Sequence, residues 1–183
     1  VDLDTRQTIF VCPGKDSETF RSFSEWLVEH EGDPSLIEVV SMDMSNAFTS
    51  GCMTYFPHAH IVYDKFHMVQ ETNKRLDEVR KAEASEKKLL KGHRFTLLHL
   101  RKNLSEGRLQ ELETILLTYP SLGKAYSLKE GLVDILNAAT AKEEGAWGDF
   151  LKWMEMAESS ALEPFITQTT VIIRILQLIY HHL

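Results

Sequence analysis

The sequence has little cysteine and no long hydrophobic run. Cys12 and Cys52 are the only cysteines among its 183 residues. Two are too few for a disulfide-bonded scaffold, which favours a reducing compartment. No apolar stretch approaches the roughly 20 residues that a membrane-spanning helix requires. The first residues, Val1–Asp4, resemble neither a signal peptide nor a natural start, so we expect a cut inside a longer protein.

Several common catalytic signatures are also absent. Gly14-Lys15 lacks the upstream glycine and the following Ser or Thr of a phosphate-binding loop. In Asp2-Leu3-Asp4-Thr5 the Thr comes three residues after the first Asp, whereas aspartate-nucleophile phosphatases place it four residues after. No Gly-x-Ser-x-Gly element and no nucleotide-binding glycine fingerprint occurs. The sequence therefore gives no support to these enzyme classes.

The composition is that of a folded protein with unevenly distributed charge. Hydrophobic residues make up 43% of the chain and charged residues 26%, so a core can be buried. Residues 1–64 contain 3 Lys or Arg against 11 Asp or Glu, whereas residues 65–102 contain 11 against 5. An acidic block is thus followed by a basic block. Such separation favours a polyanionic partner at the basic face.

The first third of the chain alternates strand and helix patterns. Three segments rich in β-branched and aromatic residues predict strands. Between them, apolar residues recur at helical spacing in two segments, the first after Asp16 or Ser17 and the second after Ser45. We therefore predict the order strand, helix, strand, helix, strand. The predicted strands are residues 7–12, 37–42 and 59–63.

From residue 65 onward the strand signal disappears. A long charged helix is predicted from about Phe66 to Leu90, and later segments carry apolar residues three and four apart, as on one face of a helix. We predict two domains, a partial α/β core over residues 1–64 and an all-α region over residues 65–183. The later helices are predicted around residues 109–116, 128–135, 147–154 and 165–176.

Two acidic residues directly follow predicted strands. Asp43 and Asp64 therefore lie where ligands gather in open α/β sheets, and their carboxylate oxygens are suited to Mg²⁺. His67 comes three residues after Asp64 and is placed to face the same crevice. A structural interpretation is open for each of them, because Asp often caps a helix and His67 could simply hydrogen-bond Asp64.

A zinc site is the less favoured interpretation of the histidines. His58 and His60 form a loose cluster with Asp64 and His67 in the sequence. No cysteine pair supports this cluster, and its spacing fits no standard zinc site.

Basic residues on the predicted helices could follow a nucleic-acid backbone without reading bases. The interleaved acids Glu71, Asp77 and Glu78 could instead pair with them, which leaves an ordinary solvated helix face as an equal alternative. The residues assigned to backbone contact are Lys74, Arg75, Arg80, Lys81, Lys87, Lys88 and Arg94.

Two segments give the chain a resemblance to a known family. Ser41-Met42-Asp43-Met44-Ser45, followed about twenty residues later by Asp64-Lys65-Phe66-His67, closely resembles the DDE insertion-sequence transposases of the ISL-three type. The resemblance extends over essentially the whole chain. Further agreement comes from Asn73, Leu76-Asp77, Val79-Arg80 and the Ala-Tyr-Ser-Leu-Lys-Glu segment at residues 125–130.

The resemblance implies a truncated RNase H-like core followed by an all-α insertion region. It implies that Asp43 is the second acid of a catalytic triad and a ligand of Mg²⁺ or Mn²⁺, with Asp64 and His67 as supporting residues. The first acid is then expected upstream of Val1 and the last beyond Leu183. The isolated chain is therefore expected to bind metal weakly and to cleave no DNA.

The implied activity is metal-dependent DNA cleavage and strand transfer during transposition. Its partners would be transposon ends and target DNA, in the cytoplasm of a bacterium and away from any membrane. An open sheet edge would also favour a homodimer. Two alternatives stay open: an α/β phosphohydrolase with a helical cap that uses Asp43 and Asp64, and a non-enzymatic helical interaction module. A salt-sensitive affinity for DNA would favour the transposase over the module.

Overall fold

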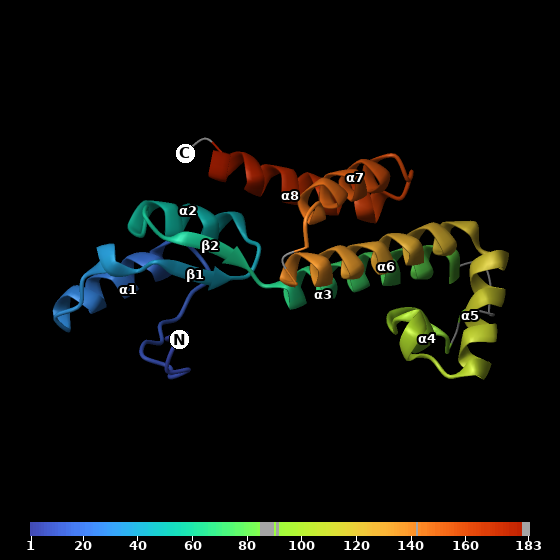
Figure 1. The fold of residues 1–183 in the computed structure, drawn as a ribbon, viewed down its shortest axis with the longest axis horizontal. Helices are drawn as coiled ribbons and strands as arrows, with labels where there is room; N and C mark the ends of the chain where they lie inside the picture. The colour runs from blue at the N-terminus through green and yellow to red at the C-terminus, as the bar shows by residue number, and fades with distance from the viewer. Residues whose placement is uncertain (85–89, 91, 142, 181–183) are drawn as a thin grey trace. The chain divides into compact units, whose positions relative to one another are not determined.

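The computed structural model describes residues 1–84, 90, 92–141 and 143–180 (Figure 1). The chain divides into two compact units, which we treat separately. The first contains residues 1–64 together with the chain from Ile172 onward, and the second contains residues 65–171. One boundary between these units follows Asp64, and the other falls inside the last helix. The predicted division into an α/β domain over residues 1–64 and an all-α domain over residues 65–183 stays a prediction.

The first unit is a small α/β structure. Strands β1 and β2 pair in parallel, with Val39 opposite His60 and Met42 opposite Tyr63. Helix α2 connects the two strands, and this confirms the predicted strand–helix–strand sequence. The elements are α1 (Glu18–Glu29), η1 (Pro34–Leu36), β1 (Val39–Met42), α2 (Asn46–Tyr55) and β2 (His60–Tyr63).

The prediction of a strand over residues 7–12 is wrong. This segment has no regular secondary structure and does not join the two-stranded sheet. A strand exists only when its backbone groups find a ladder partner, and the local sequence does not supply one. The apolar pattern instead reflects side-chain packing, because the Phe10 ring contacts Phe23 and Trp26 of α1 at centroid distances of 5.5 and 5.6 Å.

The core of the first unit lies on one face of the sheet. Met42, Cys52 and Phe56 are buried at its centre. Aromatic residues of both helices pack around them; Phe20, for example, meets Phe56 edge-on. Apolar side chains of α1 and α2 therefore cover the same sheet face. The partly buried residues of this cluster are Phe20, Phe23, Leu27, Ile37, Val40, Phe48, Tyr55, Ala59, Ile61 and Tyr63.

The second unit is helical. The long charged helix predicted from Phe66 to Leu90 is α3, which ends at Ala84; residues 85–89 lie outside the described residues. The short helix α4 was not predicted. Pro120 follows the end of one helix and begins the next, at a first helical position where proline lacks no required N–H hydrogen bond. The elements are α3 (Lys65–Ala84), α4 (Arg94–Leu98), η3 (Arg101–Asn103), α5 (Glu106–Thr118), α6 (Pro120–Thr140), α7 (Ala146–Glu158) and the first part of α8 (Glu163–Tyr180), whose residues from Ile172 onward belong to the first unit.

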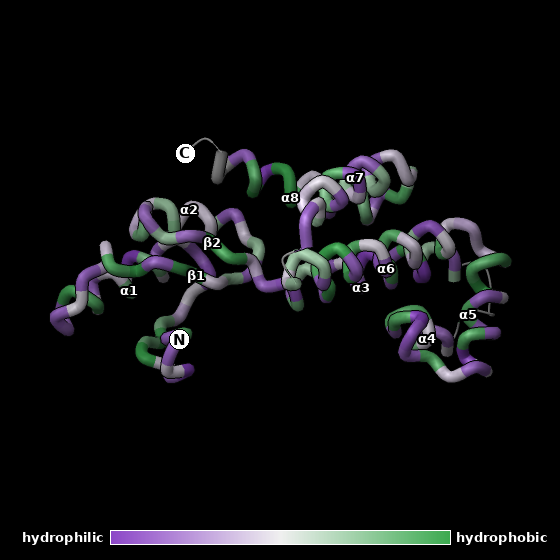
Figure 2. The backbone as a smooth tube through the Cα atoms, in the orientation of Figure 1, coloured by the Kyte–Doolittle hydropathy of each residue, from purple (hydrophilic) through white to green (hydrophobic). Residues whose placement is uncertain are grey.

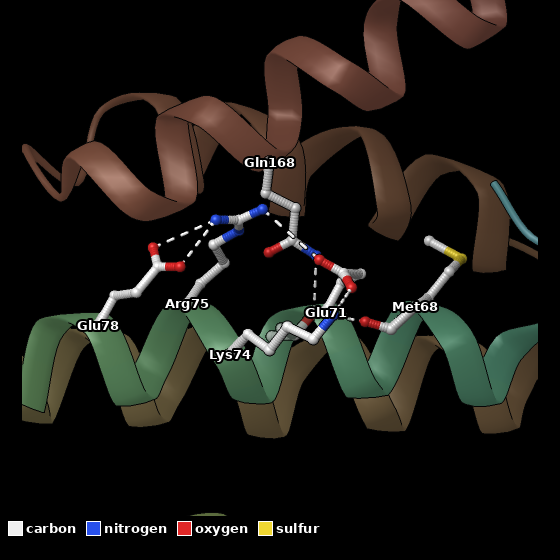
Figure 3. Close-up of polar contacts among 7 residues, drawn as sticks. Met68, Glu71, Lys74, Arg75, Glu78 and Gln168 are labelled. Atoms are coloured by element: carbon white, nitrogen blue, oxygen red, sulfur yellow. Dashed lines mark hydrogen bonds and ion pairs between the residues drawn. The ribbon is translucent and has the colours of Figure 1, made fainter. Parts of the chain in front are cut away.

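Helix α6 is central to the second unit and packs against α3, α5 and α7. Hydrophobic and hydrophilic residues alternate along its tube in Figure 2, as expected of a helix with buried and exposed faces. The Trp153 indole N–H of α7 donates to the Leu128 carbonyl of α6 at 2.8 Å. The buried Gln168 amide of α8 donates to the Thr72 hydroxyl of α3 at 2.7 Å (Figure 3). None of the described helices has the length and hydrophobicity that a membrane crossing needs.

We predict that Gly51→Ala destabilises the first unit. A Cβ at Gly51 would lie 2.8 Å from the Phe20 ring and 2.9 Å from the Ser17 Cα, closer than atoms can approach. The overpacking should cost about 1–3 kcal/mol and outweigh the roughly 1 kcal/mol that alanine gains in a helix. The free energy of unfolding in urea measures this change.

Gly131→Ala is the matched control for that substitution. It also places alanine in a helix interior, but its Cβ would meet the Trp153 ring at an ordinary 3.7 Å. We expect it to be neutral or stabilising. Equal effects of the two substitutions would contradict the close approach of α2 to α1.

Candidate functional site

The carboxyl ends of the two strands bring Asp43 and Asp64 to one edge of the sheet. The backbone N–H of Asp64 donates to the Met42 carbonyl at 3.0 Å. Met42 lies opposite Tyr63, so Asp43 and Asp64 occupy neighbouring positions just beyond the paired residues. Asp43 is exposed and Asp64 is half-buried. The edge therefore combines two carboxylates within reach of solvent.

A partly buried pair of hydroxyl groups holds the start of α2 against the end of β2. The Thr49 hydroxyl donates to the Ser45 carbonyl at 2.8 Å and lies 3.0 Å from the Tyr63 hydroxyl. Burial raises the pKa of Tyr63, so its hydroxyl stays protonated at neutral pH. This contact ties the turn after Asp43 to the residue before Asp64. Sequence reasoning missed it, although a tyrosine on the buried face of a strand indicates a polar partner.

His67 lies in the first turn of α3 and so belongs to the second unit, whereas Asp64 ends the first. The shared crevice of Asp64 and His67 stays a prediction. His60 begins β2 and Asp64 follows its end, so the two are about 13 Å apart along an extended strand. The loose cluster with His58 and His60 is therefore not formed. Among the described residues no three His, Cys, Asp or Glu side chains are grouped to hold a metal ion.

The two carboxylates have the donor type that a divalent metal needs, but not the full number of ligands. Mg²⁺ takes oxygen ligands and is often bound through one or two carboxylates together with substrate phosphates. Asp43 and Asp64 supply this donor type from adjacent strands. They supply two residues, whereas a pair of ions bridged by a phosphoryl group needs more. This edge can thus contribute part of a metal site.

The basic residues of α3 have carboxylate partners along the helix. Lys74 pairs with Glu71, and the Arg75 guanidinium lies between Glu71 and Glu78, at 3.5 and 3.0 Å (Figure 3). Arg75 is half-buried, and its Nε–H has no hydrogen-bond partner among the described residues. These are the helix pairs that the sequence offers as the alternative to backbone contact.

The other predicted contact residues gather around Asp77. Arg80 and Lys81 pair with it from the same helix, and Arg94 reaches it from α4. Lys87 and Lys88 lie outside the described residues. The structure thus brings together three of the predicted residues through one carboxylate.

Residues 1–182 match the family model of ISL3-type DDE transposases, which is described as transposase. The chain belongs to the ISL3-type transposase family. It is 30% identical over 171 residues to the transposase for insertion sequence element IS1001 of Bordetella parapertussis. The match covers 88% of this chain and 41% of that protein, so the chain spans about two fifths of the curated relative. No solved structure matches the chain.

A buried lysine in this transposase chain was missed by sequence reasoning. Lys129 of α6 is 1% exposed, and its ammonium donates to the carbonyls of Leu97 and His99 at 3.0 and 2.6 Å. The Tyr126 hydroxyl donates to the same His99 carbonyl at 2.9 Å. Glu130 completes the cluster at 3.5 Å from the ammonium.

These contacts hold the end of α4 against α6. The last carbonyls of a helix have no partner within the helix, and a cation there also complements the helix dipole. Lys129 therefore fixes where α4 ends. The sequence did carry a signal for this role, because Lys129 occupies the spacing of the buried residues Leu122, Ala125 and Leu132 on one helix face.

We predict that Lys129 makes the free energy of unfolding change with pH in the alkaline range. Burial lowers the pKa of Lys129 to about 8, and Glu130 offsets only part of that effect. An unfolded lysine titrates near 10.4, so between about pH 8 and 10.4 the unfolded chain binds more protons. The free energy of unfolding should therefore rise over this window, by up to roughly 3 kcal/mol relative to Lys129→Met.

Urea unfolding at a series of pH values measures this difference. Lys124→Met is the matched control, because Lys124 is exposed on the same helix. The free energy of unfolding of Lys124→Met should change with pH in the same way as that of the unchanged chain. A constant difference between the unchanged chain and Lys129→Met from pH 7 to 10.5 would contradict the buried charge.

Proposed function

We propose that the chain is part of a transposase that cleaves and joins DNA by metal-dependent phosphoryl transfer, with Asp43 as a catalytic metal ligand. The observation that carries this proposal is the placement of Asp43 and Asp64 at one edge of a parallel strand pair. Family membership over residues 1–182 favours a transposase over a phosphohydrolase that would use the same two acids.

The proposed reaction has two steps. Water first attacks a phosphodiester at the element end, and the broken bond leaves a free 3′-hydroxyl. That hydroxyl then attacks a phosphodiester of the target DNA, forms a new bond and releases a target 3′-hydroxyl. A bound divalent metal would neutralise charge on the phosphoryl group and stabilise the attacking and leaving oxygens.

The residues of this chain would supply part of the machinery. Asp43 would hold a metal through its carboxylate oxygens, and Asp64 would lie beside it with His67 in support. The hydroxyl pair of Thr49 and Tyr63 would keep the turn after Asp43 in place. We propose that further carboxylates come from parts of the protein outside these 183 residues. As an isolated chain it would then be inactive.

DNA is the proposed partner, and its backbone would be contacted by basic residues of the helical unit. Salt-dependent binding follows from such contacts, because each neutralised phosphate releases counterions. The proposed set is Lys74, Arg75, Arg80, Lys81, Lys87, Lys88 and Arg94.

We expect Asp43→Asn in the full-length transposase to abolish element excision and strand transfer, with a loss of at least about a thousandfold, because a metal ligand is removed. Asp16→Asn, an exposed acid of the same unit, is the matched control and should leave transposition unchanged. A gel assay for cleaved element ends and joined products in Mg²⁺ or Mn²⁺ measures both. Full activity of Asp43→Asn would refute the proposed role.

A further inference from the structure

One buried carboxylate in the helical unit gathers three cations. Asp77 is 6% exposed. Its Oδ1 lies 2.8 Å from Arg80 Nε and 3.5 Å from Arg94 Nε, and its Oδ2 lies 3.0 Å from Lys81 Nζ. Arg80 and Lys81 belong to α3, whereas Arg94 belongs to α4. The cluster of Asp77, Arg80, Lys81 and Arg94, here called the Asp77 hub, thus joins two helices.

The Asp77 hub carries an excess of positive charge. Among the residues that the structure describes, three cations share this one carboxylate, which leaves a formal charge of +2. The neighbouring set on α3 differs, because Lys74 and Arg75 are matched by Glu71 and Glu78. Cations that are each paired with a carboxylate attract an anion only weakly. The unneutralised positive charge of the Asp77 hub therefore distinguishes it from the other basic residues of α3.

The charge of Asp77 itself is secure at neutral pH. Burial alone would raise the pKa of Asp77, but the hydrogen bonds and charges of Arg80 and Lys81 outweigh it and hold the pKa below its ordinary value. Without this carboxylate the three cations would repel one another. One negative charge reduces this repulsion but does not neutralise all three positive charges.

Two of the three cations remain open to solvent. The Lys81 and Arg94 side chains are 66% and 56% exposed, whereas the Arg80 side chain is 13% exposed. They border a polar groove of about 530 Å³ in the second unit. Glu78 is a negative group on its wall, and it is already paired with Arg75. The groove is lined by Gln70, Asn73, Lys74, Asp77, Glu78, Lys81, Arg94 and Leu98.

The position of Arg94 is fixed at both ends of α4. Before α4 begins, the His93 ring lies 2.8 Å from Glu111 of α5. Where α4 ends, Lys129 of α6 binds the Leu97 carbonyl. Thr96 and Leu97 are also buried, so packing and these polar contacts together hold α4 in place. These contacts hold Arg94 beside the cations of α3.

We propose that the Asp77 hub is a phosphate site that binds the phosphodiester backbone of duplex DNA through Lys81 and Arg94. The inference rests on the proposed function and narrows its DNA contact to one place. Arg80 is largely buried and pairs with Asp77, and Asp77 positions the cations without touching DNA. Contacts of this kind read no bases, so the site binds without sequence preference.

Binding of this chain to a fluorescently labelled duplex, followed by anisotropy over a range of salt concentrations, tests the proposal. A single phosphate contact contributes about the −0.9 power of the salt concentration, so Lys81→Gln and Arg94→Gln should each weaken binding roughly fivefold to tenfold at 0.1 M salt. The slope of log affinity against log salt should fall by about one for each substitution. An unrelated duplex of equal length should show the same losses.

Lys152→Gln is the matched control. Lys152 is 74% exposed and pairs with a single carboxylate, Asp149, three residues away. It removes the same charge from a matched pair and should leave affinity and salt slope unchanged. If Arg94→Gln shifts the melting temperature, Lys81→Gln alone carries the test, because its exposed side chain can be replaced without disturbing packing.

Each outcome decides the proposal. Loss of affinity in the hub variants with an unchanged control supports the phosphate site. Binding that is equal in all variants overturns it and makes the hub a structural ion cluster. No binding by the unchanged chain also overturns it. Neither result bears on the proposed metal-dependent cleavage, which the excision assay on Asp43→Asn tests separately.

Discussion

The parallel pairing of β1 with β2 is the constraint on which the proposed chemistry depends. Its register sets Asp43 and Asp64 side by side, and a slip of one residue would turn each strand's apolar side chains away from the core. Apolar contacts with Met42, Cys52 and Phe56 oppose such a slip. The Thr49–Tyr63 contact adds a polar tie close to the carboxylates. Packing of the core therefore determines where the acids lie.

In the helical unit, buried charged side chains determine where exposed side chains lie. Lys129 and Asp77 are nearly inaccessible, yet both are charged and both are surrounded by partners. A buried charge is tolerated only when it is paired or hydrogen-bonded, so each fixes its neighbours firmly. Lys129 sets the end of α4, and Asp77 sets Arg94 against α3. The exposed side chain of Arg94, on a short helix, is in this way placed by buried polar groups around it.

Local patterns predicted much of this fold, and partners distant in sequence account for what they missed. β1, β2 and the long helices carry their periodicity within a few residues, and the family resemblance was confirmed. The segment 7–12 has a strand-like composition but no ladder partner. Lys129 escaped notice because lysine is ordinarily exposed, and its partners lie some thirty residues away. The acid–base pairs within α3 could be anticipated from their spacing along the helix. The ion pair of Arg94 with Asp77 could not, because it depends on how α4 packs against α3.

Metal binding at the sheet edge is the central claim, and paramagnetic NMR of this chain tests it most directly. Mn²⁺ at low concentration broadens the amide signals of residues near the site where it binds, even when binding is weak. We predict selective broadening around Asp43 and Asp64 that Mg²⁺ reverses and that Asp43→Asn abolishes. Broadening spread evenly over exposed acids, or unchanged in Asp43→Asn, would contradict the account.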